Sequence, residues 1–388
     1  FNANSNYNIS SDGTAPGSDS VSSTTATFVD RDNRDYRLAD SDTVAKDAGT
    51  TTPMNYSGDT IYDIQGTLRG SNWDIGADEV TTEYVSTICE NSSAGGDCAE
   101  LDYKSLSTWE DAGEVDLTAT TTRVFSGSIT GALNENNTVT LYESGAITSI
   151  TATVVATTSD QILLDNIDTG NASATNALIV NNQVLSVAPS SVWQLDASNY
   201  WTVTSATTSD LLGASPLAIA KIDGAWSVAD NVNAVLAGWE TDVDNYINIY
   251  TTDLARHDGK WDTSAYRNVA LVRSDEFYTI VDGLQVDGYL SICHEFSPPS
   301  QKIYNSDVRV FNSIVKNGGI QGRSETNCNL LIANNIVYNH SGVFSAIYAY
   351  SIKAYIYNNT VFNSDVGIRA VGGNVFAINN IVASTTNS

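Results

Sequence analysis

Short apolar runs and asparagine alternate in a pattern that returns four times between residues 311 and 382. The four copies are FNSIVKN (311–317), ANNIVYN (333–339), YNNTVFN (357–363) and INNIV (378–382). The steps between the repeated asparagines are 22, 24 and 21 residues, counted along Asn312, Asn334, Asn358 and Asn379. A nearly fixed period of this length, with strand-like runs beside each asparagine, predicts a stack of similar coils.

A parallel β-helix accounts for this repeat. One coil alone is too small to bury its apolar face, whereas stacked coils bury one another's Ile, Val, Leu and Phe side chains. Asparagine tolerates the left-handed backbone conformation that tight corners require, and stacked asparagine side chains can hydrogen-bond to one another along the stack. The alternative is four unrelated asparagine turns in an ordinary β-protein. We therefore expect an all-β fold with a coiled stack of parallel strands.

A different pattern occupies residues 118–235. The runs TTTRVFSGSI, NTVTLYES, ITSITATVVAT and QILLDNI alternate polar and apolar residues, and NENN, TSD and DTGNAS lie between or after them as turns. This alternation predicts short antiparallel strands, so we expect a small inserted β-domain that PLAIAKIDGAW closes. Its aromatic residues Trp193, Tyr200 and Trp201 are candidates for stacking on sugar rings, although such residues are more often part of a core.

The sequence LDYKSLSTWEDAG, which precedes this domain, predicts one short helix. Ser105 or Ser107 can cap its first turn, and Gly113 can end it. Leu106 and Trp109 then face inward. The changes of pattern divide the chain into four parts, which are terminal coils (1–80), a connector (81–117), the inserted domain (118–235) and the opening coils (236–388).

Three motifs near the N-terminus follow one another in a specific order. They are FVDRDNRDYRLADSDTVAKDAGT (28–50), DIQGTLRG (63–70) and WDIGADE (73–79). This order resembles the closing segment of bacterial surface or secreted proteins of the pectate-lyase-like superfamily, which end in a DIGA.E motif. ARHDGKWD and the strand around GLQ (283–285) resemble the first coils of the same proteins. The resemblance covers residues 1–80 and 241–388, implies a right-handed parallel β-helix and is silent about catalysis.

The closing motifs therefore precede the coils that they would close. The chain stops in the middle of the repeat at NNIVASTTNS, and FNANSNYNISSDG at the N-terminus resumes it. One chain could close this ring by itself, successive units of a giant polypeptide could be joined, or separate chains could polymerise. We favour head-to-tail joining of copies, because an uncovered stack end exposes unpaired backbone groups. The expected interface consists of Phe1, Tyr7, Ile9, Asn379, Asn380, Ile381 and Val382.

The end of the stack is expected to be locked by charge-assisted hydrogen bonds and an aromatic plug. The residues of this lock are Asp63, Arg69, Trp73, Asp74 and Asp78. The alternative for the same segment is a calcium site made of Asp74, Asp78 and Glu79, because hard cations prefer several oxygen ligands. No other metal or cofactor is expected.

The charge balance argues against two kinds of partner. Lysine and arginine number 18 against 45 acidic residues, so the formal net charge is −27. Nucleic acids and anionic membrane surfaces require a basic face, which this composition argues against. No run of eighteen apolar residues is present to span a membrane.

The four cysteines form two plausible pairs, Cys89 with Cys98 and Cys293 with Cys328. Neither spacing suits zinc, and two disulfides would indicate an oxidising, extracellular location. Free thiols are the alternative.

An enzyme of the β-helix type, a polysaccharide lyase or glycoside hydrolase, is the main rival to a structural role. The ionisable groups of the coils do not recur at one position of successive coils, as a stacked active face requires. The best hydrolase pair would be Asp307 with Glu325. His257, His294 and His340 lie far apart in sequence and form no metal-binding motif. We expect a secreted, non-enzymatic filament subunit that binds copies of itself, and a glycan-binding adhesin is the other alternative.

Overall fold

The computed structural model describes most of the chain and shows an all-β protein. The described residues are 7–15, 17–30, 35–38, 42, 44–46, 48–49, 74–76, 83–119, 121–143, 146–168, 190–203, 217–243, 245–293, 306–323, 328–342 and 345–387. Within them lie three parallel sheets, one antiparallel barrel, two small two-stranded sheets and the helix α1 (Leu106–Gly113). The expectation of an all-β chain with many parallel strands is confirmed.

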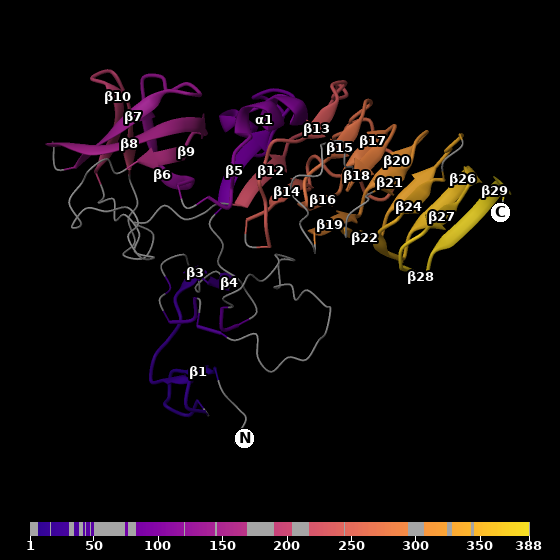
Figure 1. The fold of residues 1–388 in the computed structure, drawn as a ribbon, viewed down its shortest axis with the longest axis horizontal. Helices are drawn as coiled ribbons and strands as arrows, with labels where there is room; N and C mark the ends of the chain where they lie inside the picture. Colours follow the sequence, from indigo (N-terminus) through magenta and orange to yellow (C-terminus); the bar gives the residue numbers. More distant parts are fainter. Residues whose placement is uncertain are drawn as a thin grey trace.

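Three parallel sheets together form what we call the stack (Figure 1). The first sheet has eight strands, β5 (Glu83–Ile88), β12 (Leu217–Ile222), β14 (Ile247–Thr251), β16 (Tyr278–Asp282), β19 (Ser306–Phe311), β22 (Cys328–Ala333), β25 (Lys353–Tyr357) and β28 (Val375–Ile378). The second has six, β13 (Ala234–Leu236), β15 (Val272–Ser274), β18 (Leu290–Ile292), β21 (Ile320–Arg323), β24 (Ile347–Tyr350) and β27 (Ile368–Val371). The third has five, β17 (Gln285–Asp287), β20 (Ile314–Lys316), β23 (Ile336–Tyr338), β26 (Thr360–Val366) and β29 (Ile381–Asn387).

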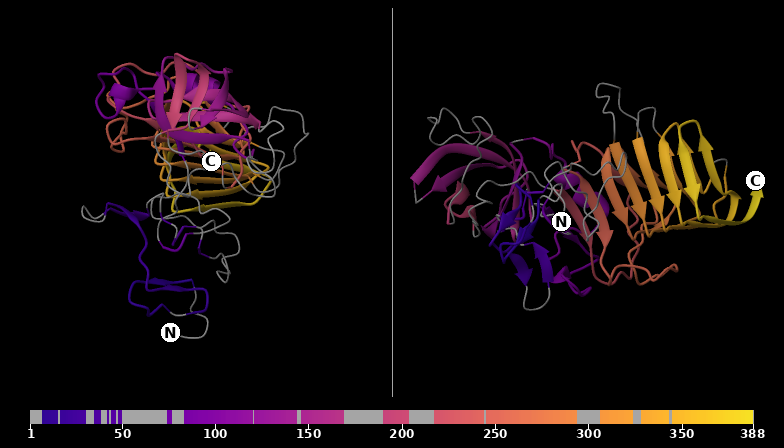
Figure 2. Two further views of the ribbon diagram at one scale, coloured as in Figure 1. Left: turned by 90° about the vertical axis from the view of Figure 1, so that its left-hand side faces the viewer. Right: turned by 90° about the horizontal axis from the view of Figure 1, so that it is seen from below.

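The chain visits these sheets in a repeating order. After β16 in the first sheet it forms β17 in the third sheet and β18 in the second, and then returns to the first sheet with β19. The same cycle continues through β22, β25 and β28. We call one pass through the three sheets a coil. Successive coils lie side by side along the long axis of the molecule (Figures 1 and 2).

Identical positions of successive coils face one another, so the core consists of rows of like side chains. In the third sheet, Val286, Val315, Val337 and Val361 pair in register and are fully buried. Matching rows in the other two sheets contain mostly Ile, Leu, Val and Ala. This arrangement explains why each coil repeats the same apolar pattern, since every row member packs against its neighbours in the row.

Asparagine forms the corners between the first and third sheets. Asn312, Asn334, Asn358 and Asn379 have φ values of 48°, 62°, 54° and 59°, which is the left-handed conformation expected of them. The residue after each of them points into the stack. There Asn335 donates its backbone N–H to Asn359 Oδ1 (2.9 Å), and Asn359 donates its own to Asn380 Oδ1 (2.9 Å).

This series, which we call the corner ladder and whose members we call rungs, begins at Leu284 and Ser313 and continues through Asn335, Asn359 and Asn380. Its rungs are buried as far as Asn359, and Asn380 is half-buried. Leu284 N–H donates to Ser313 Oγ (3.2 Å), and Ser313 N–H donates to Asn335 Oδ1 (2.8 Å). Each asparagine also returns its side-chain N–H groups to backbone carbonyls, such as Asn359 Nδ2 to Ile332 O (2.9 Å). Stacked asparagines were predicted from the repeat, but the second residue of each pair forms the ladder while the first makes the left-handed turn.

The inserted segment forms a closed six-stranded barrel in which all neighbouring strands are antiparallel. Its strands are β6 (Arg123–Thr130), β7 (Thr138–Glu143), β8 (Ala146–Thr157), β9 (Gln161–Asp168), β10 (Val192–Asp196) and β11 (Asn199–Val203). Trp193 and Trp201 are fully buried in its core. They are therefore core residues, as the sequence analysis allowed, and are not exposed to sugars.

Two runs that the sequence analysis assigned elsewhere belong to the stack. LAIAKI forms β12, and the supposedly connecting EYVSTI forms β5, at the edge of the first sheet. The expectation that PLAIAKIDGAW closes the inserted domain is wrong, and residues 234–235, which were assigned to that domain, belong to β13 of the stack. The residues of β12 are buried on both faces, which is typical of a strand inside a parallel sheet.

Helix α1 has the predicted position and caps. Ser105 Oγ accepts the backbone N–H of Thr108 (3.1 Å), and the helix ends at Gly113. Trp109 is buried and stacks on Trp239 with ring centroids 5.5 Å apart. A side chain at Gly113 would collide with Trp239, so glycine here permits close packing as well as the end of the helix.

Both predicted disulfides are present, joining Cys89 to Cys98 and Cys293 to Cys328. The second joins the residue that follows β18 to the first residue of β22, so it ties one coil to the next but one. Two disulfides fit an oxidising, extracellular location.

The N-terminal part contains β1 (Ile9–Ser10) paired in parallel with β2 (Val21–Ser22), and β3 (Phe28–Asp30) paired in antiparallel with β4 (Asp35–Leu38). Figures 1 and 2 place these strands beside the stack and away from β27, β28 and β29.

Replacing one rung of the corner ladder is expected to destabilise the stack. In Asn359→Ala, the backbone N–H of Asn335 loses its acceptor and the Ile332 carbonyl loses a donor inside a buried corner. We expect the free energy of unfolding to fall by about 2 kcal/mol, measured by denaturant titration. Asn329→Ala, at a half-buried outward position of β22, is the matched control. Equal stability of the two variants would contradict a structural role for the ladder.

Candidate functional site: the open end of the stack

The two ends of the stack differ. At the β5 end, Leu106 and Trp109 of α1 pack into the same apolar cluster as Tyr84 of β5. The barrel contacts this end as well, because Gln161 accepts the N–H of Val85 and donates to the Glu83 carbonyl, both at 2.8 Å. A helix and a second domain therefore cover this end of the core.

At the opposite end, the outer strands are β27, β28 and β29. Each pairs on one side only with a strand described in the structure, β24, β25 and β26 respectively. We call this end, with its three strand edges, the open end. Because a strand edge presents a row of backbone donors and acceptors, the open end is a template for a further strand in each sheet.

The core rows continue into the open end and become accessible there. Val361 is fully buried, whereas Val382, which follows it in the same row, is 45 % exposed. Ile356 is fully buried, and Ala377 opposite it is exposed. The last coil thus has the side chains of a core position without the cover that every earlier coil has.

Large apolar side chains extend the accessible surface of the open end. Ile381 is 60 % exposed and Ile378 is 54 % exposed. Phe376 stacks on Tyr355 of the preceding coil, with ring centroids 5.2 Å apart, and is 48 % exposed. Contiguous exposure of this kind is typical of a surface that binds another protein.

The corner ladder also reaches the open end. From Leu284 to Asn359, the backbone N–H of each rung donates to the side-chain oxygen of the rung after it. Asn380 is the last rung among the described residues. A further coil that supplied a side-chain oxygen would extend the ladder by the same bond.

The expected interface residues occupy two separate places. Asn379, Asn380, Ile381 and Val382 all lie in the last coil, at the open end. Tyr7 and Ile9 lie in or next to β1, away from that end (Figure 1). Phe1 lies outside the described residues.

Of the expected end lock, the structure describes Asp74 alone, which is buried. Asp63, Arg69, Trp73 and Asp78 lie outside the described residues, as does Glu79, the third ligand of the alternative calcium site. Both interpretations of that segment stay predictions.

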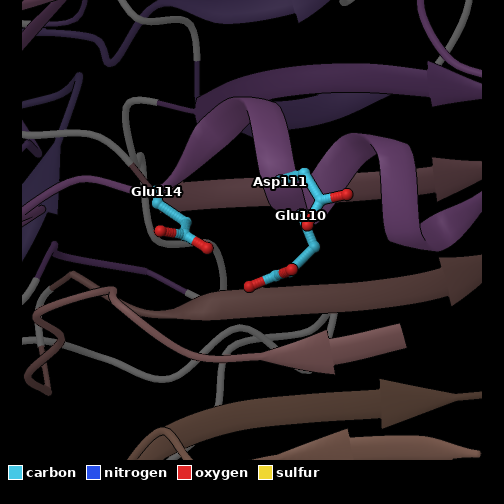
Figure 3. A group of neighbouring side chains, drawn as sticks. All are labelled: Glu110, Asp111 and Glu114. Carbon is cyan, nitrogen blue, oxygen red and sulfur yellow. The ribbon is translucent and has the colours of Figure 1, made fainter. Parts of the chain in front are cut away.

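An acidic cluster that was not predicted from the sequence lies at the C-terminal end of α1 (Figure 3). Glu110, Asp111 and Glu114 each place a carboxylate oxygen within 4.8 Å of the others. Glu110 is buried, and its Oε1 accepts the N–H of Ala237 (3.0 Å). Glu276 lies close by and accepts the N–H of Trp239 (3.0 Å). The sequence shows the helical spacing of Glu110, Asp111 and Glu114. It does not show that Glu276 lies close to α1 in the fold.

Burial raises the pKa of Glu110 to about 8, and the carboxylates of Glu114 and Asp111 act in the same direction. Burial also raises the pKa of Glu276 to about 8, with Asp275, Glu110 and Glu114 adding to the shift. The backbone N–H groups that these two carboxyls accept oppose the shift without cancelling it. With these pKa values, the carboxyl groups of Glu110 and Glu276 are mostly protonated at neutral pH, next to the helix that covers the end of the stack.

The carboxylates weighed for catalysis take part in structural contacts. Asp307 pairs with Arg309, whose side chain is 2 % exposed. Its guanidinium lies on the outward face of the first sheet and still is buried, and burial lowers its pKa to about 9. Glu325, the second member of the hydrolase pair, lies outside the described residues.

Corner carboxylates are also engaged. Asp282 pairs with Arg256 and accepts Asn312 Nδ2 (2.7 Å). Asp287 pairs with Lys316 (3.0 Å) and accepts Asn317 Nδ2 (2.7 Å).

His340 is buried and packs edge-on against Tyr289, and His257 lies in another coil. His294 lies outside the described residues. The two described histidines belong to different corners, so the structure gives them no common site.

No family model, curated protein or solved structure matches this chain. Among the described residues, no helix has the length and apolar character needed to cross a membrane.

The acidic cluster generates a pH prediction. Glu110 and Glu276 have pKa values near 8 in the folded chain, against 4.5 for the free side chain. Between pH 4.5 and pH 8 the folded chain therefore binds more protons than the unfolded chain does. Their contribution to the free energy of unfolding is fully present below about pH 4.5, falls as the pH rises toward 8 and is lost above that. The fall is at most about 1.4 kcal/mol per pH unit for each group.

Glu276→Gln keeps an oxygen for the Trp239 N–H but cannot ionise, so its unfolding free energy should depend less on pH in this window than that of the parent chain. Denaturant titrations at pH 5 and pH 8 measure the difference. Glu135→Gln, at an exposed site in the barrel, should leave the dependence unchanged. If the unfolding free energies of the parent chain and of Glu276→Gln changed by the same amount between pH 5 and pH 8, the assignment would be contradicted.

Proposed function

We propose that this chain is the structural subunit of an extracellular filament, in which copies join head to tail through their stacks. The stack is a right-handed parallel β-helix in this proposal, and the open end of one copy is covered by another copy. The copies are either separate chains or successive units of one longer polypeptide. The two disulfides and the dense backbone pairing suit a durable extracellular material.

The main support for this proposal is the exposure of core side chains at the open end. There Val382 is 45 % exposed, while Val361, its neighbour in the same row, is fully buried. Covering this end removes apolar surface from water and pairs three strand edges at once. Strand addition of this kind derives its affinity from backbone hydrogen bonds and its register from side-chain pockets. No other surface in the described part of the chain combines three strand edges with an interrupted core.

The asymmetry of the two ends supports a filament rather than a closed dimer. An open end facing another open end would be isologous and would finish at two copies. The β5 end is already covered by α1 and the barrel, so the partner surface lies elsewhere on the copy. A contact between two different surfaces is heterologous, and it produces an open filament unless the rotation closes a ring.

The contacts of the carboxylates favour this proposal over an enzyme. Asp282, Asp287 and Asp307 each form an ion pair with a neighbouring Arg or Lys. Such pairs give these carboxylates a structural role in corners and on outward faces.

A charge in the interrupted core row tests the proposal. In Val382→Asp a carboxylate would have to be buried in an apolar row, so the critical concentration for assembly should rise by at least about a hundredfold. Negative-stain electron microscopy and sedimentation velocity of the purified chain measure this. Val228→Asp, at a site that is 63 % exposed and remote from the open end, is the control and should assemble normally.

Long fibres from the parent chain and the control, with monomers from Val382→Asp, are the expected result. Fibres from Val382→Asp at the parental concentration, or monodisperse particles from the parent chain, would contradict the proposal. Denaturing gels of native material then separate one giant polypeptide from many 41.4 kDa subunits.

A further inference from the structure

The N-terminal segment contains the same hydrogen-bond pattern as the corner ladder. Asn8 donates its backbone N–H to Ser20 Oγ (2.9 Å), and Val21 donates its backbone N–H to the Asn8 carbonyl (2.8 Å). Strands β1 and β2 then pair in parallel, with Ile9 opposite Val21 and Ser10 opposite Ser22. Asn8 and Ser20 are therefore related by the same hydrogen bonds and strand pairing as two successive rungs of the ladder.

The last corner of the stack shows the correspondence. Asn359 donates its backbone N–H to Asn380 Oδ1 (2.9 Å), Ile381 donates its backbone N–H to the Asn359 carbonyl (2.8 Å), and β26 and β29 pair in parallel from that point. A serine as the accepting rung also occurs in the stack, at Ser313. Two bonds and one strand pairing thus agree between segments that lie apart in the structure.

The backbone before the rung agrees as well. Tyr7 has a φ of 54°, close to the 59° of Asn379, and each immediately precedes its rung residue. A left-handed conformation is uncommon for a bulky aromatic residue. Its presence at Tyr7 indicates that the segment is held in the corner conformation rather than in a generic turn.

We propose that residues 7–22 of a second copy form the next two rungs beyond Asn380. This inference rests on the proposed head-to-tail assembly and specifies its register. Strand β1 of the second copy pairs with β29, so that Ile9 lies opposite Ile381 and Ser10 opposite Val382. The Oδ1 atom of Asn8 accepts the backbone N–H of Asn380, and Ser20 provides the rung after it.

The ladder fixes the direction of growth. In the stack, the N–H of an earlier rung always donates to the side chain of a later rung. The bond from Asn8 to Ser20 has the same direction, so the segment fits the open end only with Asn8 next to Asn380. Reversed docking would place Ser20 there and leave β1 outermost.

A serine in the core row is compatible with this register. The inward rows already include Thr279 and Ser274, which are buried and hydrogen-bonded to each other (2.9 Å). Ser10 can likewise keep a partner within its own segment, where Thr14 donates its backbone N–H to Ser10 Oγ (2.9 Å). The rival register, shifted by one residue, would put Ile9 in the apolar row opposite Val382 and reverse the face of every side chain in β1.

Pairs of engineered cysteines distinguish these registers in the full chain. Neighbouring parallel strands bring opposed Cα atoms within the range that a disulfide can bridge. The native cysteines are all paired, so engineered thiols are the reactive ones. The variant with Ile9→Cys and Ile381→Cys should give a ladder of covalent multimers on non-reducing gels, whereas Ile9→Cys with Val382→Cys should not. Electron microscopy under reducing conditions checks that each double variant still assembles.

The other possible results of the cross-linking experiment would contradict either the register or the occupant of the open end. Multimers from the second pair alone would overturn the register. A cross-linked product that keeps the mass of one chain would show that the segment fills its own open end and not that of a second copy. Filaments without cross-links from either pair would assign the open end to another segment and leave the proposed function standing. Absence of filaments from the parent chain would contradict both proposals.

The rung at Asn8 has a separate test. Asn8→Ala removes the oxygen that accepts the Asn380 N–H, and we expect the critical concentration for assembly to rise about tenfold. Asn8→Ser should restore much of the loss, because Ser313 and Ser20 show that a hydroxyl serves as a rung. Asn91→Ala, at an exposed turn near the first disulfide, is the control. Unchanged assembly by Asn8→Ala would show that Asn8 is not a rung.

Discussion

Every coil of this protein depends on the next coil for its backbone hydrogen bonds, for the cover of its apolar side chains and for the acceptor at its corner. In the third sheet this dependence is visible in one row of valines, which are fully buried up to Val361 and 45 % exposed at Val382. Nothing within a single coil can replace what the following coil supplies, because the backbone groups of a strand point along the stack axis. The last described coil therefore exposes the kinds of group that each coil before it pairs and covers.

The covered end shows what closing such a stack requires. A helix with a buried tryptophan, a second tryptophan stacked on it and contacts from a separate barrel are all present there. Glu110 and Glu276 accept backbone N–H groups at the same place, in surroundings where burial holds their pKa near 8. This end is closed by a helix and a second domain, whereas the last described coil at the open end has the same kinds of residue as the coils before it.

Much of this architecture follows from local rules that a sequence displays. The asparagine period predicted the corners because left-handed residues recur at the same places in each coil, and α1 was predicted because Ser105 and Gly113 mark its ends. The assignment of β12 failed because an apolar run of six residues suits a barrel as well as a buried parallel strand. Glu276 could not be found in advance, since only the fold brings it to α1. The ladder was expected, but local sequence does not show which asparagine of a pair turns inward.

The direction of the corner ladder has a consequence for assembly that apolar contact alone would not have. Hydrophobic burial at the open end is nondirectional and would accept any apolar partner of suitable shape. A row of N–H donors, each directed at a side-chain oxygen of the following rung, accepts only a segment with an oxygen at that position and a strand beginning one residue later. Asn8 with β1 has both features, and Ser20 with β2 repeats them. The corner that gives the stack its period therefore also provides a physical basis for selecting the chain segment that extends it.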